Sequence, residues 1–101
     1  SGRERKLRLR MQEKNWSAEL SKYALKHLEK LNKKKANRIL ETLEKLEKAE
    51  NPLLHKDVRP LIGKLRGFYR LRVGEYRIIF ELDRKNKRIG IHLILSRGNV
   101  Y

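Results

Sequence analysis

Two short segments in the last third of the chain carry arginine among alternating apolar residues. Arg70 and Arg72 fall at alternate positions of segment 68–73, and Arg77 lies in segment 76–82. Alternation with a period of two is typical of a β-strand and places Arg70 and Arg72 on one face. Guanidinium groups bind phosphate oxygens through paired N–H donors. These residue types therefore favour binding of phosphate, and so of nucleic acid, on a sheet face.

The two residues between the segments predict how they pair. Gly74-Glu75 fits the loop of a two-residue type II′ hairpin, which pairs Val73 with Tyr76. The register that follows gives these apolar pairs on one face: Leu71 with Ile78, and Tyr69 with Phe80. We expect this apolar face to lie against helices.

On the opposite face the same register places Arg72 directly across from Arg77, with Arg70 beside Ile79. Like charges that face each other across strands are destabilising, and folding alone does not require them. A bound anion between the guanidiniums would relieve the repulsion. The alternative interpretation is the solvated face of an ordinary sheet.

A third strand is predicted over 89–96, where apolar residues again alternate. A turn of even length within 84–87 pairs Ile91 with Phe80 and Leu93 with Ile78. This register predicts that His92 and Ser96 join the arginine side, with Arg97 and Tyr101 just beyond the strand. A structural histidine is the alternative for His92.

The rest of the chain predicts an α+β domain over residues 15–101 that follows a basic, flexible N-terminal arm or cloning remnant over 1–14. A short strand at 16–20 precedes Ser21, a good helix N-cap, and apolar residues at helical spacing. Asn32 is a second cap, before a helix over about 33–49 whose stripe comprises Ala36, Ile39, Leu40, Leu43 and Leu46. Segment 53–63 reads as a connector. The predicted order is therefore a strand, an antiparallel helical hairpin and a three-stranded antiparallel meander.

Composition limits the function. The 27 Lys and Arg residues exceed the 12 Asp and Glu residues, for a net charge of +15, which favours a polyanionic partner. A solubility device or a heat-adapted surface is the alternative. The absence of Cys fits a reducing cytoplasm and excludes thiolate chemistry. No apolar run is long enough to span a membrane. His27, His55 and His92 fall in separate elements, so we expect no metal site and no cofactor.

These residues also carry a family resemblance. Three stretches resemble the RelE toxins of the RelE/ParE toxin–antitoxin superfamily: Leu65-Arg66-Gly67, the hairpin from Tyr69 to Phe80, and Arg97-Gly98-Asn99-Val100-Tyr101. The resemblance implies a RelE-like fold and a ribosome-dependent endoribonuclease that cuts messenger RNA in the ribosomal A site and inhibits translation. It also implies a cognate RelB-type antitoxin.

The resemblance assigns roles to particular residues. Arg72, Arg77, Arg97 and Tyr101 match the family's catalytic positions, with Tyr101 matching a tyrosine that stacks on a base. RNA or phosphate binding is expected of Arg70, Lys64, Arg66 and His92. The best-known bacterial members carry lysine at the positions of Arg70 and Arg72, so this chain departs from the family there.

Cleavage would proceed by metal-independent attack of a 2′-hydroxyl on the neighbouring phosphate, which needs a base, an acid and stabilisation of negative charge. Arginine suits only the last task, because it stays protonated. His92 is a candidate base, since histidine titrates near neutrality. Two alternatives share the fold: a ParE-like inhibitor of DNA gyrase, and a non-catalytic RNA-binding protein.

Overall fold

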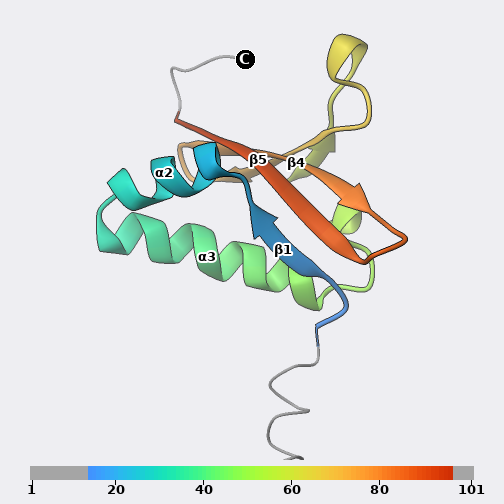
Figure 1. Ribbon diagram of the computed structural model, residues 1–101, viewed down its shortest axis with the longest axis horizontal. Helices are drawn as coiled ribbons and strands as arrows, with labels where there is room; N and C mark the ends of the chain where they lie inside the picture. The colour runs from blue at the N-terminus through green and yellow to red at the C-terminus, as the bar shows by residue number, and fades with distance from the viewer. Residues whose placement is uncertain (1–13, 97–101) are drawn as a thin grey trace, which may run out of the picture.

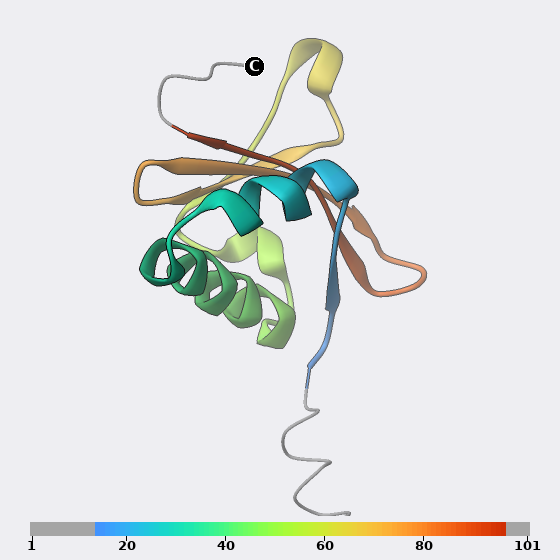
Figure 2. The same cartoon turned by 60° about the vertical axis from the view of Figure 1, so that its left-hand side comes forward.

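The computed structural model describes residues 14–96, which form one sheet with two helices on one of its faces (Figures 1 and 2). The sheet has five strands in the order β1-β5-β4-β3-β2; β1 runs parallel to β5, and the other neighbours are antiparallel. The elements are β1 (Ser17–Leu20), α2 (Lys22–Lys30), α3 (Lys33–Lys48), β2 (Val58–Pro60), β3 (Tyr69–Val73), β4 (Tyr76–Asp83) and β5 (Arg88–Ser96), with 3₁₀ turns η1 (Pro52–Leu54) and η2 (Gly63–Leu65). This is the predicted α+β fold with one additional strand, β2.

Both helices begin at the predicted caps. The Ser21 hydroxyl accepts a hydrogen bond from the Ala24 N–H at 3.1 Å and donates one to the His92 carbonyl at 2.7 Å, which ties α2 to β5. The Asn32 side chain caps α3 by accepting from the Lys35 N–H at 2.9 Å. Side-chain caps satisfy N–H groups that have no partner within the helix. The two helices therefore start where the sequence places them.

One stripe of α3 supplies much of the core. Ile39, Leu43 and Leu46 are buried against the sheet, as predicted from their spacing. Leu40 was expected in the same stripe, but its side chain is 44% exposed. Its position lies one residue beyond Ile39 on the helix, at the margin of the face that meets the sheet. None of the helices within residues 14–96 is long and apolar enough to cross a membrane.

The β3–β4 hairpin has the predicted register. Val73 pairs with Tyr76, and Gly74 has a positive φ of 59° that a type II′ turn requires at this position. Further along the strands, Leu71 pairs with Ile78 and Tyr69 with Phe80. Leu71, Ile78 and Phe80 are fully buried beneath the helices, so this face of the hairpin forms the centre of the core.

The register of β5 differs from the prediction beyond its midpoint. Phe80 pairs with Ile91 as expected, but the pairing shifts between Ile79 and Phe80, so Leu93 faces Ile79 and Ile94 faces Ile78. His92 is the residue without a partner, as in a β-bulge. The shift buries Ile94, which is 2% exposed, and leaves Leu93 38% exposed. The prediction that Leu93 pairs with Ile78 was therefore wrong.

Strand β2 was not predicted. It lies in the segment expected to be a connector, and it pairs Val58 with Leu71, Arg59 with Arg70, and Pro60 with Tyr69. Three residues are too few for an alternation to be recognised. Proline is tolerated at a sheet edge, where its missing N–H costs no hydrogen bond, and Pro60 occupies such an edge.

The β4–β5 turn gives a prediction about acid. The Asn86 side chain and backbone donate to the Asp83 carboxylate at 2.8 and 3.2 Å, and these hydrogen bonds lower the pKa of Asp83. The folded-state pKa is below the unfolded one, so the resulting stabilisation is present above about pH 4 and is lost as the pH falls through the folded pKa. We expect Asn86→Ala to raise the Asp83 pKa toward its ordinary value.

Carboxyl NMR titration of Asp83 measures this change directly. Asn37→Ala, on the exposed side of α3, is the matched control and should leave the titration of Asp83 unaltered. An Asp83 pKa that is the same with and without the Asn86 side chain would show that the side-chain hydrogen bond does not act on the carboxylate.

Candidate functional site

Four arginines lie on the sheet face opposite the helices, and we call this set the arginine face: Arg59, Arg70, Arg72 and Arg77. Arg72 stands directly opposite Arg77, as predicted, and Arg70 is paired with Ile79 on one side. On its other side Arg70 faces Arg59 from β2. The face therefore holds two opposed pairs of like charges, where the sequence predicted one. Arg59 was missed because β2 was missed.

Three of the four guanidiniums turn toward oxygen atoms at the margins of the face. Arg72 Nη2 lies 3.4 Å from Asp57 Oδ1. Arg77 Nη1 donates to the carbonyls of Tyr76 at 3.1 Å and Gly74 at 3.4 Å. Arg59 Nη1 donates to the carbonyls of Val58 at 2.8 Å and Lys56 at 3.0 Å.

Arg70 is the exception at the centre of the face. Its Nε atom is buried and has no hydrogen-bond partner among the described residues. A buried donor without an acceptor costs about 1–3 kcal/mol, so each such group needs an explanation. An anion bound on the arginine face would supply the missing acceptor and would screen both opposed pairs.

His92 lies on the same side of the sheet but beside a different set of groups. Its Nε2 atom is 3.5 Å from Glu81 Oε2 without forming a hydrogen bond, and its ring meets the edge of Phe68 at a centroid distance of 5.1 Å. Ile79 lies between Glu81 and Arg77 along β4. The histidine was expected on this face and is there, with Ile79 separating it from the Arg72–Arg77 pair.

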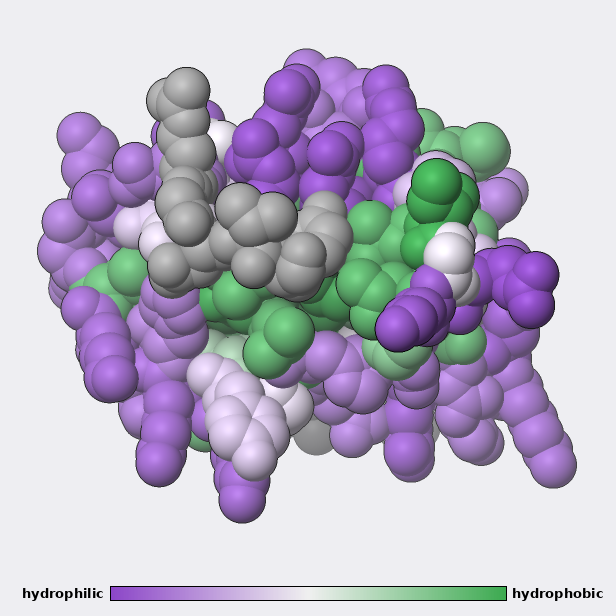
Figure 3. Space-filling view, turned by 90° about the horizontal axis from the view of Figure 1, so that it is seen from above, coloured by the Kyte–Doolittle hydropathy of each residue, from purple (hydrophilic) through white to green (hydrophobic). Residues whose placement is uncertain are grey.

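An apolar hollow of about 360 Å³ adjoins His92. Its lining comes from α2, η2, β4 and β5 and from the aromatic ring before β3, and it includes Tyr23, Leu65, Phe68, Ile79 and Leu93. Figure 3 shows apolar side chains on this side of the molecule between hydrophilic ones. The arginine face therefore has an apolar neighbour, an arrangement that suits a ligand with both phosphates and flat rings.

The other predicted site residues are dispersed. Lys64 and Arg66 are exposed on the connector around η2, which projects from the sheet (Figure 1), and neither side chain pairs with another described residue. Ser96 pairs with Tyr76, a core residue, so the β-bulge puts it on the helix side and the prediction for its face was wrong. Arg97 and Tyr101 lie outside the described residues. Within 14–96, no three His, Asp or Glu side chains are grouped so that they could hold a metal ion.

Comparisons with known proteins show the family and the fold. A family model described as the ParE toxin of a type II toxin–antitoxin system, parDE, matches residues 18–101. The match spans most of the chain, from β1 through the arginine face to the last residue. A comparison with curated proteins gave no match.

Solved structures share the fold. The archaeal RelE–RelB complex from Pyrococcus horikoshii has 32% sequence identity and a TM-score of 0.70, with 85% of this chain and 99% of that chain covered. The RelBE2 toxin–antitoxin complex from Mycobacterium tuberculosis has 20% identity and a TM-score of 0.70, with coverage of 82% and 99%. The YoeB dimer from Staphylococcus aureus has 24% identity and a TM-score of 0.61, with coverage of 78% and 93%.

The opposed pair predicts an unusual stability result. Replacing Arg77 by leucine removes its repulsion with Arg72 and leaves the buried pair of Leu71 and Ile78 in place. We expect Arg77→Leu to lose no stability in the free protein and to gain at most a few tenths of a kcal/mol, roughly the scale of a cross-strand pair.

Thermal and urea unfolding measure this difference. Leu71→Ala is the contrasting variant, because truncating a fully buried leucine costs about 2–5 kcal/mol. A loss of more than about 1 kcal/mol in Arg77→Leu, beyond the usual scale of cross-strand pairs, would mean that Arg77 stabilises the fold.

Proposed function

We propose, because this chain belongs to the RelE/ParE superfamily of type II toxin–antitoxin toxins, that it cleaves messenger RNA on the ribosome and so inhibits translation. The observation that carries the proposal is the arginine face, which holds two opposed arginine pairs, and in which the buried Arg70 Nε has no acceptor among the described residues. A phosphodiester is an anion whose oxygens match guanidinium donors. Because translating ribosomes are in the cytoplasm, we propose that the protein acts there.

The proposed reaction is an internal transfer at phosphorus. The 2′-oxygen attacks the neighbouring phosphate, the bond to the 5′-oxygen breaks, and the products are a 2′,3′-cyclic phosphate and a 5′-hydroxyl. Arg72 and Arg77 stabilise the charge that builds on the phosphate oxygens, a role for which permanently charged donors are suited. Arg97 is proposed to join them, and Tyr101 to stack on a base. Arg70 holds the RNA in place, with Lys64 and Arg66 as further contacts.

Both proton transfers are assigned to His92, which takes the proton of the attacking 2′-hydroxyl and then passes a proton to the departing 5′-oxygen. Its Nε2 atom has no hydrogen-bond partner among residues 14–96, and its ring lies beside Phe68 at the border of the apolar hollow. A base of the RNA in that hollow would bring the 2′-hydroxyl side of the nucleotide toward the histidine. None of these steps requires a metal ion.

A cognate antitoxin of the RelB type is the proposed partner. The P. horikoshii relative was solved as a RelE–RelB complex. A strongly cationic face is best neutralised by an acidic segment, because complementary potentials steer and fix such complexes. We therefore expect the antitoxin to cover at least part of the arginine face.

Inhibition of DNA gyrase is the second candidate, and the match to a ParE family model favours it. An inhibitor that acts by binding alone does not need opposed arginines around an unpartnered donor. The two functions are separated by incubating the protein with translating ribosomes, with cuts mapped by primer extension, and in parallel with gyrase and relaxed plasmid. Cuts in the messenger with unchanged supercoiling support the ribonuclease, and the reverse result supports the inhibitor.

The arginine pair predicts a large effect on cleavage. Arg77→Leu should lower ribosome-dependent cutting about a hundredfold or more, because a charged contact to the phosphate is lost in the transition state. Arg84→Leu, in the exposed β4–β5 turn, removes the same charge away from the site and should cut at a rate near that of the unsubstituted protein. Equal activity of the two variants would remove Arg77 from the mechanism.

Metal removal gives a further prediction. Cleavage should persist in EDTA at a magnesium level that still holds ribosomes together, since the proposed groups are arginine and histidine side chains. The initial rate of messenger cutting is the measurement. Activity that disappears on chelation and returns only with zinc or manganese would contradict the metal-independent reaction.

A further inference from the structure

We propose that bound RNA continues from the arginine face around the sheet edge into a second phosphate-binding groove between α3 and the β3–β4 turn. This inference rests on the proposed function and extends its substrate-binding surface. The groove has a volume of about 340 Å³. Its cationic lining comprises Arg38, Lys45, Lys56 and Arg72. Arg72 also belongs to the arginine face, so the two surfaces share a residue.

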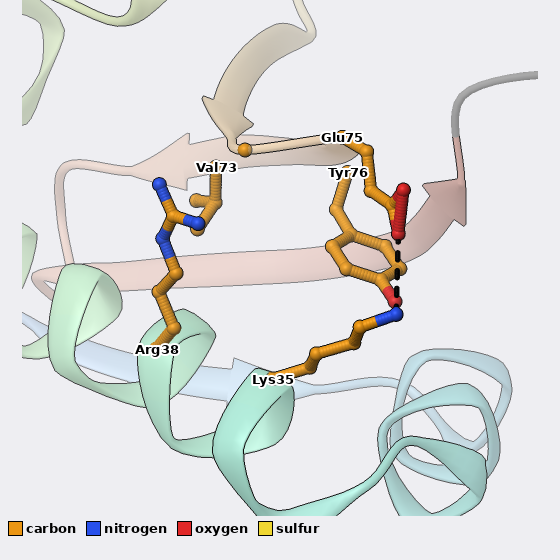
Figure 4. Close-up of a pocket in the computed structure, with 6 residues that line it drawn as sticks. Lys35, Arg38, Val73, Glu75 and Tyr76 are labelled. Atoms are coloured by element: carbon orange, nitrogen blue, oxygen red, sulfur yellow. Dashed lines mark hydrogen bonds and ion pairs between the residues drawn. The ribbon is translucent and has the colours of Figure 1, made fainter.

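Arg38 is the residue that singles out this groove. No described residue accepts a hydrogen bond from its guanidinium or forms an ion pair with it. The guanidinium lies against the β3–β4 turn (Figure 4). Its Nη1 is 3.0 Å from the position that a Cβ on Gly74 would occupy. The glycine that the turn requires thus also leaves room for a cation from α3.

Two guanidiniums approach Gly74, and a third lines the same groove. Arg38 approaches from α3, Arg77 Nη1 reaches the Gly74 carbonyl at 3.4 Å, and Arg72 lines the same groove as Arg38 and Gly74. Cations gathered in this way repel one another unless an anion lies among them. A phosphate next to one already bound by Arg72 would lie within this group.

The acidic residues of the groove do not neutralise it. Its two carboxylates, Asp57 and Glu41, are outnumbered by the four cationic side chains, and Asp57 already pairs with Arg72. His55 also lines the groove, and its Nδ1 accepts a hydrogen bond from the Asp57 N–H at 3.0 Å. That bond leaves Nε2 as the nitrogen that carries hydrogen, so the ring can donate to an oxygen ligand.

Single-stranded RNA fits these features better than an acidic peptide does. The groove is continuous with the proposed cleavage site through Arg72, and phosphates recur along one strand at a regular spacing. Guanidinium groups on both sides of the turn can then hold successive phosphates of one chain. An acidic peptide would need only the charge of the groove and not its connection to the arginine face.

The test uses fluorescence anisotropy with a short single-stranded RNA whose 2′-hydroxyls are methylated, so that it cannot be cut, across a series of salt concentrations. We expect Arg38→Gln to lower the slope of log affinity against log salt by about 0.7, the contribution of one phosphate contact on a single strand. Arg38→Gln combined with Lys45→Gln should lower it by about 1.4. Arg38→Lys keeps the charge and should restore most of the slope.

Lys26→Gln and Lys30→Gln, singly and together, are the matched controls. Both residues are exposed on α2 and line a different depression from the groove, so they remove the same charge elsewhere. Their slopes should remain near that of the unsubstituted protein. Melting temperatures of all variants confirm that each one is folded.

Several results would contradict RNA binding in the groove. Equal losses of slope in the Arg38 and Lys26/Lys30 variants would mean that only the overall charge of the protein acts. An unchanged slope in Arg38→Gln would show that Arg38 does not contact a phosphate. If Arg38→Gln weakens the binding of poly-glutamate but leaves the binding of RNA unchanged, the groove binds an acidic peptide and not RNA. Failure of the unsubstituted protein to bind RNA with a salt-dependent affinity would contradict it as well. Cleavage is scored separately, so an unsubstituted protein that binds RNA through Arg38 but does not cut overturns only the ribonuclease.

Discussion

The apolar face of the sheet fixes where the arginines of the opposite face must lie. Successive side chains of a strand point to opposite faces, so the register that buries Leu71, Ile78 and Phe80 also sets Arg72 against Arg77. Burial of each large apolar side chain stabilises the fold by about 1.5–3 kcal/mol. An unfavourable cross-strand pair costs on the order of 1 kcal/mol or less. The core therefore outweighs the repulsion, and the fold holds like charges together.

Several features of the site follow from this constraint. Three guanidiniums reach oxygen atoms at the rim of the face, whereas Arg70, between Arg59 and Ile79, has no such oxygen for its Nε. The arginine face thus combines the Arg70 Nε donor with an excess of positive charge. One fold can carry several functions, so function has to be argued from these side chains.

The sequence allowed the hairpin to be predicted because two independent signals agree there: a glycine suited to the turn and an unbroken alternation on both sides. The second half of β5 lacked such a signal. Apolar residues occupy both odd and even positions there: Ile91, Leu93, Ile94 and Leu95. The alternation therefore does not reveal that a bulge at His92 shifts the register. Strand β2 was too short to show alternation, so the place of Arg59 on the arginine face could not be predicted. The position of Arg38 beside Gly74 could not be predicted either, because it depends on how α3 packs against the sheet.

The central claim is that the arginine face binds a phosphate, and the Arg70 side chain reports on it most directly. The ¹⁵N resonance of Arg70 Nε and its attached proton can be followed while a non-cleavable 2′-deoxy oligonucleotide is added to the protein. The account predicts a saturable shift of this resonance with the downfield proton position of a new hydrogen bond, together with shifts at Arg72 and Arg77. An Arg70 Nε signal that stays unchanged while the oligonucleotide binds elsewhere would contradict it.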